Sequence, residues 1–126
     1  MRYAEVYEGW KADPDGFWME QARAIDWDRM PSKAIFETDA PVPEWFVDGM
    51  VNTCWNAVDR HVEQGRGEQT AIIHDSPVTH TKREIPYVEL RNRVATLAGA
   101  LKAKGVEKGD RVIIYMPMIP EAAVAM

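Results

Sequence analysis

The feature that most constrains the fold is a run of apolar residues, "RVIIYM", which covers residues 111–116 near the C-terminus. It follows the turn residues of "VEKGD" and is rich in the β-branched residues that strands favour. A near-continuous apolar run bounded by turn residues is typical of a strand covered on both faces, as in a parallel sheet. Such a strand needs neighbours on both sides. The sequence therefore predicts a piece of an open α/β sheet.

The elements around this run fit the same architecture. Residues 86–104 predict the longest helix, which Gly105 ends, because four apolar residues recur at spacings of 4, 3 and 4: Leu90, Val94, Leu97 and Leu101. Two strands, "QTAIIHD" and "THTKREI", are joined by the turn "DSPV", and neither face of the second is apolar, which predicts an edge strand. "IPEAAVAM" predicts the first turns of a second helix near Pro120.

An amphipathic helix is predicted within "DGMVNTCWNAVDRHVEQG", with Gly65 at its end. The residues at helical spacing are Val51, Cys54, Trp55, Val58 and Val62. Because Cys54 lies on this apolar stripe, we interpret it as a small buried hydrophobe and not as a nucleophile. Asn52 and Asn56 lie four residues apart on the polar side, where they are placed to hydrogen-bond a neighbouring loop.

The first third of the chain carries all five tryptophans: Trp10, Trp18, Trp27, Trp45 and Trp55. Two short helices are predicted there, the second with Asp13 as its N-cap and Pro14 at its first position. Three prolines in residues 29–45 predict an extended connector. This third has no core of its own, so we expect its aromatic side chains to pack on a neighbouring body. The alternative is an exposed surface that binds a partner.

Composition narrows the class of protein. The chain has 126 residues, 46% of them apolar, with a net charge of -5 and a pI of about 5.2, which indicates a folded protein and argues against nucleic acid as a partner. Arg and Lys in "TKRE" and "ELRNRV" are flanked by glutamate, which favours a solvated face with local charge pairs. Cys54 is the only cysteine, which excludes an intramolecular disulfide and fits a cytoplasmic location. No secretory signal or membrane span is recognisable.

No catalytic, cofactor-binding or metal-binding residue is predicted within the chain. The histidines and Cys54 lack the close spacing of a zinc site. Asp59 and His61 lie two apart, so they point in different directions on a helix, and capping or surface polarity is the better interpretation of both. Gly65 and Gly67 precede a strand, whereas a phosphate loop leads into a helix, so a helix-ending turn explains them.

Three stretches together resemble one known family. They are "FW...QA..IDW" (Phe17, Trp18, Gln21, Ala22, Ile25, Asp26, Trp27), "WFVDGMVNTCWNAVDRH" and "KGDRVIIYMPMIPEAAVAM". In this order they resemble the N-terminal segment and first α/β elements of short-chain acyl-CoA synthetases, the acetyl-CoA and propionyl-CoA synthetases of the adenylate-forming superfamily. "CWNAVDRH" is more similar to the propionate-activating branch. Pro86 departs from the family, which commonly has a hydroxyl residue capping this helix, and we expect the proline in the first helical turn.

The resemblance implies an activity for the complete enzyme. Such enzymes join a short carboxylate, propionate or acetate, to ATP with release of pyrophosphate, and the thiol of coenzyme A then attacks the acyl-adenylate and releases AMP. ATP, Mg²⁺ and coenzyme A are therefore the implied cofactors of the parent enzyme. The family's phosphate loop, nucleotide-binding segments, acyl pocket and adenylation lysine all lie beyond Met126, so no catalytic residue carries over.

For this chain the resemblance implies residues 1–48 as an N-terminal helical segment and residues 49–126 as the beginning of the AMP-binding large domain. The fold expected is α/β and incomplete, because the run at 111–116 and the helix at Pro120 lack neighbours and a stop signal. We therefore expect a truncated, inactive piece with a structural role, whose partner is the remainder of its own large domain, with neither nucleic acid nor membrane as a partner. The alternative is a free-standing noncatalytic module that docks or dimerises through its tryptophan-rich helices.

Overall fold

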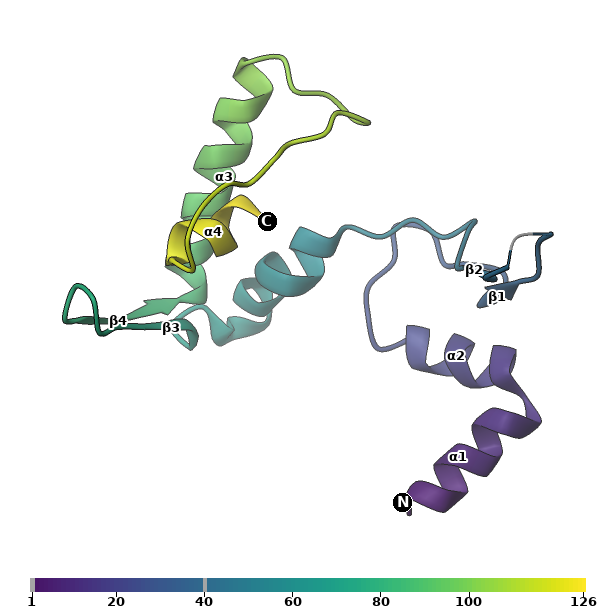
Figure 1. Ribbon diagram of the computed structural model, residues 1–126. Helices are drawn as coiled ribbons and strands as arrows, with labels where there is room; N and C mark the ends of the chain where they lie inside the picture. Colours follow the sequence, from purple (N-terminus) through teal and green to yellow (C-terminus); the bar gives the residue numbers. More distant parts are fainter. Residues whose placement is uncertain (1, 40) are drawn as a thin grey trace. The chain divides into compact units, whose positions relative to one another are not determined.

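The computed structural model describes residues 2–39 and 41–126 of the chain. They form two compact units, Met1–Asn56 and Ala57–Met126, which we call the first and second units. Figure 1 traces their helices and short strands along the chain. This mixture of helix and strand agrees with the expected α/β class, and the division expected after residue 48 stays a prediction.

The two helices predicted at the start of the first unit are confirmed. They are α1 (Tyr3–Ala12) and α2 (Pro14–Ala22). The Asp13 carboxylate accepts a hydrogen bond from the Gly16 amide at 2.9 Å, so Asp13 caps α2 and Pro14 takes its first position. α2 ends at Ala22, so Ile25 lies beyond the helix on whose apolar side we expected it.

The proline-containing connector, which was predicted to be extended, contains a short antiparallel ladder. β1 (Ile35–Phe36) pairs with β2 (Glu44–Trp45), and two residues are too few to leave a periodic signal in the sequence. The carboxylate of Asp15, on α2, accepts hydrogen bonds from the amides of Ala34 and Ile35, both at 2.9 Å. One side chain thus attaches the connector to α2.

The aromatic rings of the first unit pack against one another and are not buried in a core. Trp18 packs edge-on against Trp45 with ring centroids 5.7 Å apart. The ring centroids of Trp27 and Phe46 are 5.6 Å apart. Among the residues described in this unit, the buried hydrophobic ones are two alanines, Ala22 and Ala34. The expectation that this third has no core of its own therefore agrees with the structure, and a neighbouring body that receives the rings stays a prediction.

The helix predicted around Cys54 is present, but it is irregular. Residues 53–66 are helical and contain two wide π-type turns, η1 (Trp55–Asp59) and η2 (Val62–Arg66), and Gly65 has a positive φ of 80°. A wide turn holds more residues than an α turn, so a stripe spaced for an α-helix drifts around the surface. Val58 is buried, but Cys54 is exposed. The prediction that Cys54 is buried was wrong.

The second unit contains the predicted hairpin and both predicted helices. β3 (Thr70–Ser76) pairs antiparallel with β4 (Thr81–Pro86). They lead into α3 (Tyr87–Ala103), and α4 (Pro120–Ala125) begins with its proline at the first position. Figure 1 shows α4 beside α3. The small core joins three elements through Val58, Ile85 and Leu90.

Pro86 is the N-cap of α3 and not part of its first turn, contrary to expectation. No side chain caps the helix. The preceding loop does so with its backbone: the Tyr87 amide donates to the carbonyl of Gln69 at 3.1 Å, and the Val88 amide donates to that of Gly67 at 2.9 Å. These two carbonyls replace the hydroxyl residue that a helix start commonly uses.

The strand predicted at residues 111–116 is not formed. The segment is an open chain without strand pairing to any part of the protein that the structure describes. Ile113 and Tyr115 are 89% and 99% exposed. A strand exists through its hydrogen-bonded neighbours, and here the apolar run has none.

Within residues 2–39 and 41–126, no helix has the length and apolarity that a bilayer crossing requires.

The core makes a simple prediction about stability. Ile85 is 0% exposed and Ile73, on the paired strand, is 64% exposed. We expect Ile85→Ala to lower the free energy of unfolding by about 2–5 kcal/mol, because it removes buried methyl groups and leaves a cavity. The matched change Ile73→Ala should cost well under 1 kcal/mol. Urea unfolding of the two variants followed by circular dichroism would measure the difference, and equal losses would show that Ile85 is not the centre of this core.

Candidate functional site

The residues weighed from the sequence for catalysis are not brought together. Gly65 lies inside η2, where its positive φ kinks the helix one residue before the helix ends at Arg66, and Gly67 uses its carbonyl to cap α3. Because carbonyl oxygens already bind the first amides of α3, this helix start cannot also cradle a phosphate. Across residues 2–39 and 41–126, no group of three or more His, Cys, Asp or Glu side chains is placed to hold a metal ion.

His61 differs from its predicted role at the surface. Its ring packs against that of Tyr87 with centroids 4.6 Å apart, and its Nδ1 is shielded from solvent without a hydrogen-bond partner. Burial lowers the pKa of His61, and the charges of Arg66 and Arg60 lower it further. The imidazole therefore serves as a neutral packing group at the start of α3.

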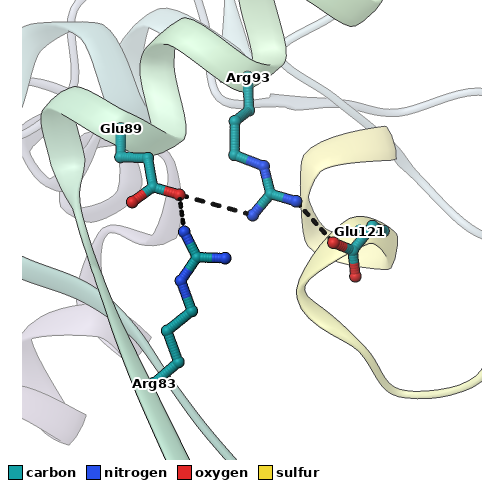
Figure 2. Close-up of polar contacts among 4 residues, drawn as sticks. All are labelled: Arg83, Glu89, Arg93 and Glu121. Atoms are coloured by element: carbon teal, nitrogen blue, oxygen red, sulfur yellow. Dashed lines mark hydrogen bonds and ion pairs between the residues drawn. The ribbon is translucent and has the colours of Figure 1, made fainter.

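Four charged side chains form a ladder across three elements of the second unit, and Figure 2 shows them. Arg83, on β4, donates from Nη2 to Oε1 of Glu89 on α3 at 2.5 Å. Nη1 of Arg93 lies 3.8 Å from the same oxygen, and its Nη2 donates to Oε1 of Glu121 on α4 at 2.6 Å. Charges alternate along the ladder, and it holds α4 against α3.

Local charge pairing was expected for the arginines of β4 and α3, and Arg83–Glu89 and Glu89–Arg93 fit that expectation. The sequence did not predict the link from Arg93 to Glu121, which lies 28 residues away. Glu121 is the second residue of α4, behind Pro120. An acidic residue there is explained locally by the positive end of the helix, so no signal pointed to a distant partner.

The ladder keeps Glu121 ionised. Its own backbone amide, the hydrogen bond from Arg93, and the charges of Arg93 and His74 lower the pKa of Glu121, against the opposing effect of burial. The two arginines are matched by two glutamates, so the ladder as a whole has no excess charge. It is better suited to fixing helices than to attracting an ionic ligand.

Beside the ladder, a groove of about 520 Å³ runs between α3 and α4. Its lining residues are Glu89, Asn92, Arg93, Thr96, Leu97, Met116, Glu121, Val124 and Ala125. Its floor is apolar, and Met116, from the open segment 111–116, forms part of it. The charged groups of the lining, Glu89, Arg93 and Glu121, belong to the ladder and are paired with one another, and the Thr96 hydroxyl donates to the backbone carbonyl of Asn92.

In the first unit, the polar residues form a clasp on the loop at Asp26. Asn56 accepts from the Asp26 amide and donates to its carbonyl, both at 2.8 Å, and the Trp55 indole donates to Oδ2 of Asp26 at 3.0 Å. This confirms the predicted hydrogen bonding of Asn56 to a neighbouring loop. Asn52 instead accepts from the Trp55 amide and caps its own helix. The "IDW" and "CWN" stretches of the resemblance therefore meet in this clasp.

Comparison with protein families assigns the chain to a class of enzymes. Residues 3–57 match the family described as acetyl-coenzyme A synthetase N-terminus, and residues 58–126 match the family described as AMP-binding enzyme. The second match covers more than half of the chain, which therefore belongs to the AMP-binding enzyme family. The border between the two matches lies one residue beyond the border between the compact units.

Individual relatives agree with the resemblance to the N-terminal part of short-chain acyl-CoA synthetases. The chain is 51% identical to bovine acyl-CoA synthetase short-chain family member 3, mitochondrial, over 90% of its length and 17% of the relative's. It is 48% identical to acetyl-coenzyme A synthetase of Streptomyces coelicolor over 98% of its length and 19% of the relative's. An uncharacterized Pseudomonas aeruginosa protein is 51% identical over the whole chain and 20% of its own length. The chain thus spans about a fifth of these relatives.

The ladder makes a prediction about pH. Because the pKa of Glu121 in the folded chain lies below its unfolded value, this residue adds stability above its ordinary pKa, and the contribution is lost as the pH falls through the folded value. Arg93→Gln should raise the pKa of Glu121 toward its ordinary value. The free energy of unfolding should then change less as the pH falls through the acid range. Carboxyl carbon NMR titration would measure this. Arg91→Gln, whose arginine pairs with Glu63, is the control, and an unmoved Glu121 in Arg93→Gln would contradict the ladder.

The clasp makes a second prediction. Asp26→Ala removes the acceptor of the Trp55 indole and should lower the free energy of unfolding by about 0.5–1.5 kcal/mol. Asp26→Asn retains an oxygen at the same place and should recover most of this loss. Thermal unfolding followed by tryptophan fluorescence would compare the two. Equal destabilisation by both variants would show that the negative charge, and not the hydrogen bond, is what matters.

Proposed function

We propose that this chain is the N-terminal portion of an ATP-dependent short-chain carboxylate–CoA ligase that forms AMP. The observation that carries the proposal is the order of the two family matches, which together run from residue 3 to residue 126. Support also comes from relatives named as acyl-CoA and acetyl-coenzyme A synthetases at 48–51% identity. The substrate would be propionate or acetate, and "CWNAVDRH" favours propionate.

The proposed reaction has two steps. A carboxylate oxygen of the substrate attacks the α-phosphorus of ATP, which releases pyrophosphate and leaves an acyl-adenylate. The thiol of coenzyme A then attacks the acyl carbon and AMP departs, so the product is an acyl-CoA thioester. When bound, Mg²⁺ would offset the phosphate charge in the first step.

The residues described here do not fit a site for these reactants. The start of α3 is capped by backbone carbonyls, the ladder is matched in charge, and no acidic or histidine cluster is placed for a metal in the described part of the chain. We therefore assign the chain a structural role within the parent enzyme. The segment at 111–116 would join the sheet of the remaining large domain, and the chain alone would make no acyl-CoA.

A second candidate function rests on the exposed aromatic residues of the first unit. Tyr3 is exposed and stacks on Tyr7, and Trp18 and Trp45 are partly exposed. They would suit a noncatalytic module that docks on another protein. For the parent enzyme we propose a cytoplasmic location, and the feature of this chain that supports it is its single cysteine.

The test compares the product of the complete reading frame with the 126-residue chain. We expect the complete protein to release pyrophosphate and form acyl-CoA when given ATP, Mg²⁺, coenzyme A and either propionate or acetate, with the larger kcat/KM for propionate. Isothermal titration of the 126-residue chain with ATP and Mg²⁺ should show no binding. Failure of the complete protein to form acyl-CoA would overturn the ligase, and micromolar ATP binding by the short chain would overturn its structural role.

A further inference from the structure

The packing of His61 on Tyr87 joins the helix at residues 53–66 to the start of α3. The two ring centroids are 4.6 Å apart, and Tyr87 is the first residue of α3. The next residues of that helix include Glu89, which belongs to the ladder, and Leu90, which belongs to the core. A change at the contact between His61 and Tyr87 therefore affects the part of α3 on which both depend.

Three features of this contact oppose a positive charge on the imidazole. Nδ1 of His61 is shielded from solvent and has no hydrogen-bond partner among the described residues, so the N–H that an imidazolium carries there would lack an acceptor. Burial lowers the pKa of His61, and the like charges of Arg66 and Arg60 lower it further. The positive end of α3 lies beside the ring at Tyr87. The contact therefore favours the neutral imidazole.

Carboxylates of the surrounding elements do not compensate such a charge. The acidic side chains on the helix at 53–66, the hairpin and α3 are Asp59, Glu63, Asp75, Glu84 and Glu89. Three of them have partners of their own: Glu63 with Arg91, Asp75 with Lys82, and Glu84 with the Thr70 hydroxyl. Glu89 is part of the ladder. Asp59 lies two positions before His61, so the two side chains point in different directions on the helix.

We propose that the contact between His61 and Tyr87 is an acid-sensitive switch, which holds the start of α3 while the imidazole is neutral and releases it on protonation. The imidazole takes up one proton from solvent, and the charged ring then leaves Tyr87 for water. The Tyr87 amide is also a donor in the backbone cap of α3, through its bond to the Gln69 carbonyl. Release therefore begins at the first turn of α3.

The switch acts in one direction of pH. Because the folded pKa of His61 lies below its unfolded value, the contact adds its full stability above the ordinary pKa of histidine, about 6.5. This stability is lost as the pH falls toward the folded value, and no more is lost below it. The ladder responds in a separate window, since the pKa of Glu121 is lowered from a more acidic ordinary value. The switch does not depend on the proposed ligase activity.

Hydrogen exchange at several pH values tests the switch on the 126-residue chain. Protection factors correct for the intrinsic effect of pH on exchange, and those of the Tyr87 and Val88 amides should fall between about pH 7.5 and 5.5. The midpoint of His61, measured by proton NMR, sets the size of the effect. Protection should fall by up to about tenfold for each pH unit by which this midpoint lies below that of an unfolded peptide.

A matched pair of variants separates the switch from simple packing. His61→Phe keeps an aromatic ring against Tyr87 but takes up no proton, so its protection factors should stay level over this range. His80→Asn is the control and should behave like the native chain. His80 is exposed in the hairpin turn with a φ of 52°, which asparagine tolerates. Level protection in the native chain, or an equal fall in His61→Phe, would overturn the proposal.

A second variant retains the imidazole. Arg66→Gln removes a like charge at an exposed position, so it should raise the NMR midpoint of His61 and reduce the loss of protection. A raised midpoint with an unchanged loss would overturn the proposal. So would a native midpoint at or above that of an unfolded peptide, whether or not His61→Phe folds.

Discussion

The second unit depends on one small apolar contact, in which Ile85 at the end of the hairpin meets Leu90 on α3 and Val58 on η1. Few other side chains are buried among the described residues, so this contact holds most of the hydrophobic stabilisation of the unit. The charged ladder stabilises the same arrangement of elements. Arg83 and Arg93 join the hairpin and α4 to Glu89 on α3, so the charged groups maintain an arrangement whose core is only a few residues wide.

The sequence predicted elements well where the signal was local. The cap at Asp13, the four-three-four spacing of α3 and the proline at the start of α4 each follow from a few neighbouring residues, and the structure contains all three. Prediction failed where the outcome depends on other parts of the chain. Cys54 is exposed because wide helical turns displaced the apolar stripe, and such turns have no simple pattern in the sequence.

The failed strand at residues 111–116 is the most informative case. Its composition is that of a covered strand, yet composition specifies only a preference, and the strand forms when neighbouring backbone supplies the hydrogen bonds. The same limit applied to the candidate site. Arg93 and Glu121 each had a satisfactory local explanation, so their pairing across 28 residues could not be inferred without the fold. The Asp26 clasp was partly foreseen, because Asn56 lay on the polar side of a predicted helix.

The backbone cap at the start of α3 has an evolutionary consequence. The carbonyls of Gly67 and Gln69 accept the hydrogen bonds of the first amides of α3. Selection therefore does not require a hydroxyl side chain at position 86. Selection would act instead on the spacing between the turn at Gly65 and the helix start. Related sequences should therefore tolerate drift in residue type at position 86 but resist insertions and deletions in the short loop that reaches it.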